Sequence, residues 1–330
     1  MRLCILLALA LALVAAHDAA PAPQGAVRTV TFSYRSHAGT LRTAYVVLPA
    51  WYGKERHPAI PLVISPHGRG VSGSYNLRFW GDLPARGPFA LVSPDGQGRK
   101  LPFYSWGYAR QIDDLARMPA VARKALPWLR VDPRRIYAIG DSMGGQEVLL
   151  LAAHSGIRLA GVAAFDPVTS MAARYRVWHV TPGEEHLPAL ARVEFGGTPK
   201  QLPRAYAARS PDARVRAIAR SGIPTQLWWS HRDSVVTDQT VETAAFFDRV
   251  VALAPSAPVQ EVVGYWEHAR EMHPETQLPA ALACFGLVDA KGVQVPAYEV
   301  HARGTIEELP PERNQAPVAF SSAFCGRSSR

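Results

Sequence analysis

Two stretches near the N-terminal end of the chain alternate between apolar and polar residues. Val30, Phe32 and Tyr34 are the apolar positions of the first stretch, and residues 41–48 form the second. A Gly-containing turn at residues 38–39 separates them. Alternation with a period of two is typical of strands with one solvated face. The pattern therefore predicts an antiparallel hairpin at one edge of a sheet.

Further along, short apolar runs each end in turn residues. These runs are residues 61–65, 89–93, 135–140, 159–165, 223–229 and 259–263, and the last of them is the last predicted strand. Runs that are apolar throughout are typical of parallel strands buried on both faces. Between the second and third runs, apolar residues recur at helical spacing over 112–129, with a break expected at Pro119. Strands that alternate with helices predict an α/β fold, with a mostly parallel central sheet and helices on both faces.

The third run leads into Gly140-Asp141-Ser142-Met143-Gly144, and a helical pattern follows to residue 151. A Gly-x-Ser-x-Gly pattern between a strand and a helix is typical of a sharp turn that exposes a reactive serine at the tip of a sheet. Glycine is needed on both sides because side chains there would collide with the strand or the helix. The pattern predicts that Ser142 is a nucleophile and that the fold is that of an α/β hydrolase.

A serine hydroxyl is a weak nucleophile without a base, and the base needs an acid that fixes its tautomer. In this fold the acid follows the serine in the chain and comes just after a strand. Asp233 meets both conditions, because it follows the run 223–229 in a short turn. Asp166, which follows the preceding strand, and Asp238, which looks like a helix N-cap, are the alternatives.

The base in this arrangement is a histidine beyond the last strand. His268 lies there, a few residues after the run 259–263. His273 is the alternative, most simply placed within the following segment. The chain order serine, acid, histidine is the order that the fold requires.

Attack on a carbonyl builds negative charge on oxygen, and backbone N–H groups must meet that charge. We expect one donor to be Met143, next to the nucleophile at a helix N-terminus. The second should come from the His67-Gly68-Arg69-Gly70 loop, with Arg69 as the donor by position.

The substrate pocket is less clearly marked. Its candidate aromatic residues are Trp80, Tyr104, Trp106 and Trp266. Residues 168–210 show no regular pattern and connect two strands whose ends should border the site. A long connection inside a compact domain is usually functional, so we expect a lid-like insertion or pocket wall.

The chain of 330 residues is long enough for one α/β hydrolase domain, expected over 27–330, with a C-terminal tail over 285–330. Residues 1–16 begin with Met-Arg, continue as an apolar stretch and end in small residues, which is typical of a secretory signal peptide. The polar, Pro-containing residues 17–26 are typical of a disordered lead-in. We therefore expect an exported protein that has no membrane span after the signal is removed.

The net charge is +9, but the basic residues are scattered and no stripe interleaves them with aromatic residues. This pattern does not favour a nucleic-acid partner. The Cys and His residues do not have the spacing of a zinc site, so we expect no metal and no cofactor. Loss of Cys4 with the signal would leave Cys284 and Cys325, which in an exported protein predicts one disulfide.

At these motifs the chain resembles two branches of the α/β hydrolase superfamily. Residues 131–145 (VDPRRIYAIGDSMGG) are similar to secreted esterases of the feruloyl esterase and polyhydroxybutyrate depolymerase type. Residues 205–236 resemble the catalytic domain of the prolyl oligopeptidase family, in which a Tyr-x-x-x-Ser-Pro stretch precedes the strand bearing the catalytic acid. The resemblance covers most of residues 27–284 and implies a Ser142, Asp233 and His268 triad. Arg69 stands where those families usually have glycine.

The sequence therefore predicts a secreted serine hydrolase, most simply a carboxylic ester hydrolase that acts on a small-molecule or polymer-linked ester through an acyl-enzyme. The alternative is a serine peptidase of prolyl oligopeptidase type that acts on short peptides. A non-catalytic binding protein is a third hypothesis. The oligomeric state is not specified by any feature of the sequence.

Overall fold

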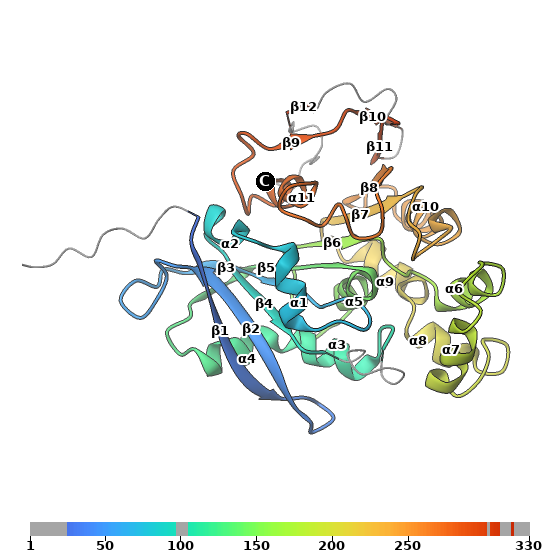
Figure 1. Cartoon of the computed structure of the whole chain (residues 1–330), viewed down its shortest axis with the longest axis horizontal. Coiled ribbons are helices and arrows are strands. Elements are labelled where there is room, and N and C mark those ends of the chain that lie inside the picture. Colours follow the sequence, from blue (N-terminus) through green and yellow to red (C-terminus); the bar gives the residue numbers. More distant parts are fainter. Residues whose placement is uncertain (1–24, 97–104, 302–303, 311–317, 320–330) are drawn as a thin grey trace, which may run out of the picture.

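The computed structural model describes residues 25–96, 105–301, 304–310 and 318–319 (Figure 1). The strands are β1 (Val27–Arg35), β2 (Leu41–Pro49), β3 (Ile60–Ile64), β4 (Ala90–Pro94), β5 (Val131–Asp141), β6 (Gly161–Phe165), β7 (Thr225–Ser230), β8 (Val259–Gly264), β9 (Gln294–Val295), β10 (Tyr298–Val300), β11 (Thr305–Glu308) and β12 (Val318–Ala319). The α-helices are α1 (Gly73–Asn76), α2 (Leu83–Arg86), α3 (Ala109–Ala116), α4 (Met118–Ala125), α5 (Ser142–Ala152), α6 (Met171–Trp178), α7 (Leu187–Phe195), α8 (Pro203–Ala208), α9 (Val215–Arg220), α10 (Thr243–Leu253) and α11 (Leu278–Cys284). Short 3-10 turns are η1 (Leu77–Phe79), η2 (Pro211–Arg214) and η3 (Gln239–Val241).

The main sheet has the strand order β1-β2-β4-β3-β5-β6-β7-β8-β11-β10. Strands β4, β3, β5, β6, β7 and β8 run parallel, whereas β2 pairs antiparallel with β4 and with β1. The predicted edge hairpin and the mostly parallel α/β sheet are therefore confirmed. The strand order reverses between β3 and β5, because β4 lies on one side of β3 and β5 on the other. Ligands of open α/β sheets bind in the crevice beyond the carboxyl ends of the strands at such a reversal.

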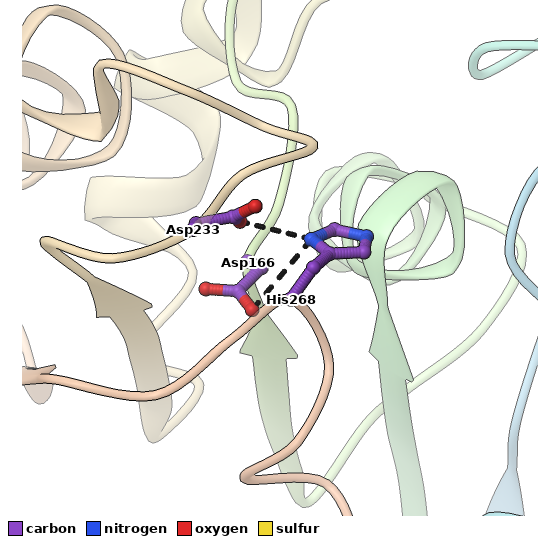
Figure 2. A group of neighbouring side chains, drawn as sticks. All are labelled: Asp166, Asp233 and His268. Atoms are coloured by element: carbon purple, nitrogen blue, oxygen red, sulfur yellow. Dashed lines mark hydrogen bonds and ion pairs between the residues drawn. The ribbon is translucent and has the colours of Figure 1, made fainter.

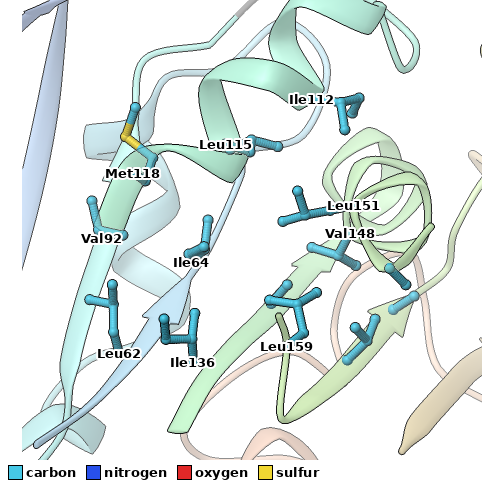
Figure 3. Close-up of a cluster of buried hydrophobic side chains, with 14 of the residues drawn as sticks. Leu62, Ile64, Val92, Ile112, Leu115, Met118, Ile136, Val148, Leu151 and Leu159 are labelled. Carbon is cyan, nitrogen blue, oxygen red and sulfur yellow. The ribbon is translucent and has the colours of Figure 1, made fainter. Parts of the chain in front are cut away.

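Successive side chains of the central strands enter two different cores. Leu62 and Ile64 of β3 belong to the core shared with α3, α4 and α5, whereas Val63 points into the core on the opposite face. Figure 3 shows the first of these cores, where Leu115 and Val148 come from helices above the strands. Because both faces are covered, these strands are apolar throughout, which is the pattern that predicted them.

The helix expected over 112–129 is two helices, α3 and α4, with the break just before Pro119. Proline occupies the first turn of α4, where a missing N–H costs nothing. The expectation of irregular structure over 168–210 was wrong, because this segment contains α6, α7 and α8. Ser170 caps α6 by accepting a hydrogen bond from the N–H of Ala173, at 3.3 Å, and Gly196 ends α7 with a φ of 86°.

The expectation that 259–263 is the last strand was also wrong. β11 pairs in parallel with β8, and β10 pairs antiparallel with β11, so the C-terminal segment extends the sheet (Figure 1). β11 escaped prediction because it contributes only one fully buried apolar side chain, Ile306. None of the helices in the described residues is both long and apolar enough to cross a membrane.

Candidate active site

Ser142 stands where β5 meets α5 and the chain turns sharply. Its φ is 55°, in the left-handed region that residues other than glycine rarely adopt. A Cβ atom on Gly144 would lie 2.5 Å from the carbonyl oxygen of Pro66, and one on Gly140 would lie 2.8 Å from the backbone of Gly144. Only glycine fits at either position. The strand-turn-helix geometry that the motif predicted places Ser142 at the carboxyl end of the central sheet.

Asp233 lies in the loop after β7, and its buried carboxylate is held by its neighbours. Oδ1 accepts hydrogen bonds from the N–H groups of Val235 and Val236, both at 2.8 Å. Oδ2 accepts a hydrogen bond from Nδ1 of His268 at 2.9 Å (Figure 2). Burial alone would raise the pKa of Asp233, but these hydrogen bonds and the charge of His268 lower it below its usual value. Asp233 is therefore ionised at neutral pH.

The ring of His268 is fixed by this contact. Because Nδ1 faces a carboxylate, the hydrogen-bond network assigns the proton of the neutral ring to Nδ1, so that Nε2 is an acceptor once the imidazole is neutral. In Figure 2 the second ring nitrogen lies on the side away from both carboxyl groups. Burial lowers the pKa of His268, but the hydrogen bond and charge of Asp233, with the charges of Asp166 and Asp141, outweigh burial and raise it to about 9.

The two alternative acids are placed differently. Asp238 is exposed at the start of η3 and accepts a hydrogen bond from the hydroxyl of Thr240 at 2.7 Å. Asp166 is buried directly after β6, and its Oδ2 lies 3.8 Å from Nδ1 of His268. Asp233 is the closer of the two acids that reach the imidazole.

The alternative histidine, His273, borders the same region but faces no acid at hydrogen-bond distance among the described contacts. Its ring lies edge-on to that of Phe79, with the centroids 4.8 Å apart. Burial and the nearby charge of Arg270 lower the pKa of His273. His268 is therefore the histidine that an acid orients.

Asp166, Asp233 and His268 also have ligand atoms within 4.8 Å of one another, a spacing that a metal ion could use. The hydrogen bonds of these atoms account for their arrangement without an ion. With the proton assigned to Nδ1, His268 donates to Asp233 and would have to lose that proton before this nitrogen could bind an ion. Oδ2 of Asp166 already accepts a hydrogen bond from the N–H of Ala269 at 2.9 Å.

Ser142 and His268 line one cavity of about 670 Å³. This volume is in the range of small-molecule sites, roughly 300–1,000 Å³. One wall comes from the segment between β6 and β7, through Arg174, Trp178 and Glu184. The sequence did not assign these three residues to the pocket, because they come from α6 and the turn after it and meet the other lining residues only in the folded chain.

The loop after β3 lies against Ser142. A Cβ atom on Gly68 would be 3.9 Å from Cβ of Ser142. The next residue, Arg69, donates from Nε to the hydroxyl of Ser105 at 3.3 Å, and its guanidinium lies 3.9 Å from the ring centroid of Trp106. Met143 lies in the first turn of α5, where N–H groups have no acceptor within the helix. Both segments expected to supply oxyanion donors thus border the cavity.

Of the aromatic residues expected in the pocket, Trp106 lines the cavity. Trp80 and Trp266 do not, and their assignment to the pocket is corrected. Trp80 is fully buried and donates from its indole nitrogen to the hydroxyl of Ser65 at 3.1 Å. Trp266 packs beside Trp228 in the same hydrophobic core as Trp80. Both stand near the loops in sequence, but their side chains pack into the hydrophobic core on one face of the sheet.

One buried ion pair and the hydrogen bonds of Ser105 fix the cavity wall to the rest of the protein. Nε of Arg174 lies 2.6 Å from Glu242, and both side chains are almost completely buried. Nη1 of Arg209 lies 2.6 Å from Glu194, which also accepts a hydrogen bond from the N–H of Ser105. The segment predicted as a lid is therefore tied down at both of its ends.

Several predictions lie outside the described residues. These are the signal peptide at 1–16, most of the lead-in at 17–26, the pocket residue Tyr104 and the disulfide partner Cys325. Cys284 is buried at the end of α11. The signal peptide and the Cys284–Cys325 disulfide stay predictions.

No protein-family model matches the sequence, and no curated protein does. Solved structures do match the fold. An acylaminoacyl peptidase from Pyrococcus horikoshii has a TM-score of 0.57 at 12% identity, covering 74% of this chain and 38% of its own. Prolyl oligopeptidase B from Galerina marginata has a TM-score of 0.56 at 14% identity, covering 79% and 36%. Dipeptidyl peptidase 4 from Porphyromonas gingivalis has a TM-score of 0.55 at 18% identity, covering 73% and 32%.

At these identities the likeness concerns the fold. This chain spans about a third of the length of each of those proteins. The described part of the chain has the α/β hydrolase fold, as the sequence predicted. The fold does not determine the activity, which depends on the residues of the site.

Proposed function

We propose that the protein is a serine hydrolase that cleaves an acyl bond through a covalent acyl-enzyme. Ser142 is the nucleophile, His268 the general base and Asp233 the acid that orients the base. The observation that carries the proposal is the 2.9 Å hydrogen bond between His268 and Asp233, which leaves Nε2 of the imidazole free in the cavity that Ser142 also lines. Such an arrangement is recognised by geometry and by the roles of its members.

In this mechanism Nε2 of His268 takes the hydroxyl proton as Oγ of Ser142 attacks the carbonyl carbon. The resulting imidazolium is stabilised by the ionised Asp233. It then gives its proton to the departing amine or alcohol, and the acyl group stays on Ser142. A water molecule then attacks the acyl carbon and gives a proton to Nε2. The imidazolium returns this proton to Oγ of Ser142 as the acyl–oxygen bond breaks, which releases the acid and the free serine.

Negative charge builds on the carbonyl oxygen in both halves of the reaction. We assign its stabilisation to the backbone N–H groups of Met143 and Arg69. Met143 contributes from the N-terminal turn of α5, where the helix dipole also favours negative charge. The close approach of Gly68 to Ser142 supports a donor in the loop after β3.

For the substrate, we favour the amide bond of a short peptide over the ester that the sequence favoured. The solved structures that match the fold are named as an acylaminoacyl peptidase, a prolyl oligopeptidase and a dipeptidyl peptidase. A cavity of about 670 Å³ can hold a few residues of peptide. A carboxylic ester is the second candidate, supported by the likeness of residues 131–145 to secreted esterases.

A panel of peptide p-nitroanilides, p-nitrophenyl acyl esters and feruloyl esters separates these candidates, with Ser142→Ala as the control for each. The proposal predicts turnover of anilides that is lost in the control. Turnover of esters alone would overturn the peptidase assignment and leave the serine mechanism intact. Equal turnover by wild type and Ser142→Ala would overturn the mechanism itself.

We further propose that the protein is exported, from the character of residues 1–16. Sequencing the N-terminus of protein secreted by a host cell tests this, with His17 expected as the first residue. Retention of the full chain inside the cell would contradict it. Failure of both Cys284 and Cys325 to react with an alkylating reagent under denaturing, non-reducing conditions would support the disulfide.

A further inference from the structure

A second carboxyl group, that of Asp166, lies close to the proposed catalytic histidine. Asp166 follows β6 directly and is fully buried. Its Oδ2 accepts the N–H of Ala269 at 2.9 Å and lies 3.8 Å from Nδ1 of His268 (Figure 2). Both Asp166 and Ala269 have positive φ values, 41° and 60°. Strained backbone of this kind persists only where the surrounding contacts over-determine it.

Asp166 is itself in contact with a third acid. Glu271, three residues after His268, is fully buried, and its carboxyl group lies within hydrogen-bonding contact of that of Asp166. Within the described residues, neither oxygen of Glu271 nor Oδ1 of Asp166 has a donor in good hydrogen-bond geometry. The backbone N–H of Glu271 itself comes near its carboxyl group and lowers the pKa, but burial and the charge of Asp166 outweigh this effect. Two buried carboxylates in contact cannot both stay charged at acceptable cost. A shared proton turns the repulsion into a hydrogen bond.

We propose that Asp166 and Glu271 share one proton and act together as a positioning pair for His268. Glu271 holds the proton and donates it to Asp166, which remains a carboxylate. Asp166 in turn holds the backbone N–H that follows His268 and presents a second anionic oxygen to the imidazole. The proposal rests on the role of His268 as the catalytic base.

The charged and titratable groups around the pair support this distribution of the proton. Asp141 faces His268 from β5, Asp233 faces it from the loop after β7, and Tyr298 approaches Glu271 from β10. Burial and the charge of Asp166 raise the pKa of Glu271 well above its usual value. Burial and the charge of Asp233 raise the pKa of Asp166 to about 7. Glu271 therefore keeps its proton in the range where Asp166 ionises.

This arrangement explains why the histidine tolerates burial. Burial lowers the pKa of His268, and Asp166 is one of the charges that raise it again. If Asp166 loses its charge, the imidazole should give up its proton at lower pH. A group that merely filled space beneath the ring would not have this effect.

The experiment is an NMR titration of the His268 imidazole in full-length protein labelled with ¹³C at histidine Cε1, assigned with His268→Gln. Asp166→Asn should move the titration midpoint of His268 to lower pH by about one unit, because one neighbouring charge is removed. Glu271→Gln keeps a neutral hydrogen-bond donor to Asp166 and should leave the midpoint near that of wild type. Glu271→Met removes the donor, so Asp166 takes up a proton and the midpoint should fall as in Asp166→Asn.

Folding of each variant is followed by thermal unfolding. An unchanged midpoint in folded Asp166→Asn, or a wild-type midpoint in Glu271→Met, would overturn the proposal. Glu271→Gln replaces a neutral acid by a neutral amide of the same shape, so its failure to fold would also overturn it. The titration needs no substrate, so it tests whether Asp166 and Glu271 share a proton independently of turnover. If no ester or anilide is turned over, only the proposed function fails.

Discussion

Gly144 lies so close to Pro66 that the two segments they belong to could not approach further. A Cβ atom on Gly144 would be 2.5 Å from the carbonyl oxygen of Pro66, closer than any real contact between such atoms. Pro66 immediately precedes the loop expected to supply an oxyanion donor, and Gly144 lies in the first turn of the helix that begins with Ser142. The missing side chain is what allows Ser142 to lie against that loop.

Gly144→Ala should therefore separate the two segments. We expect a loss of stability of about 2 kcal/mol, as for other overpacked sites, and a loss of kcat/KM of at least about 100-fold from a misplaced oxyanion donor. Urea unfolding and initial rates measure the two effects. Gly53→Ala is the matched control, because its Cβ atom would meet only the end of the Arg28 side chain, at 3.4 Å. Wild-type activity in Gly144→Ala would refute this view of the turn.

Two variants, each with an aspartate replaced by asparagine, distinguish between the candidate acids. Asp233→Asn should lower kcat by about 10³-fold or more, since an amide favours the wrong tautomer of His268. Asp238→Asn should stay near wild type, because that carboxylate is exposed and, in the part of the chain that the structure describes, its side-chain hydrogen bond is with Thr240. Steady-state rates on the best substrate of the panel measure both. Similar small losses in the two variants would remove Asp233 from the triad.

The activity should depend on pH through the imidazole. The base must be neutral to take the proton of Ser142, so kcat/KM falls as pH falls through its apparent pKa. The surrounding carboxylates raise the pKa of His268 to about 9 from its usual value near 6.5. We therefore expect kcat/KM to keep rising with pH above 6.5, with an apparent midpoint that belongs to the coupled cluster. A pH-rate profile measures it, and a plateau already reached at pH 6.5 would contradict the charge assignment.

The buried ion pair of Arg174 and Glu242 should hold the cavity wall in place. Glu242→Gln removes the carboxylate that lies 2.6 Å from the buried guanidinium of Arg174, and breaking a buried pair typically costs about 3 kcal/mol or more. We expect lower stability in urea together with a raised KM, because Arg174 lines the cavity. Asp82→Asn breaks an exposed pair with Arg86 and is the control, with an expected change below about 1 kcal/mol. An equal effect of the two substitutions would mean that the wall is held by other contacts.

The sequence was most informative where local chemistry dictates geometry. The Gly-x-Ser-x-Gly pattern predicted a turn that the structure places at the end of β5, with Ser142 in a left-handed conformation. Continuous apolar runs predicted the central strands, because both faces of each are buried. Asp233 was favoured by its place after a strand, and it is the acid nearest to His268.

The sequence was least informative where a role depends on packing between distant segments. Trp80 and Trp266 stand beside the right loops in sequence, but their rings complete the core. Glu271 gave no signal, since a single acid after a histidine is common, and only the fold brings it against Asp166. β11 has one buried apolar residue and was missed for that reason.

The central claim is that Ser142 is an activated nucleophile, and a fluorophosphonate probe tests it most directly. The probe forms a covalent bond with a serine whose hydroxyl proton is removed by a neighbouring base. Intact-mass analysis should show one adduct on the wild-type protein, mapped to the peptide containing Ser142, and none on folded Ser142→Ala. The absence of an adduct on wild type, or an adduct that persists in Ser142→Ala, would contradict the account.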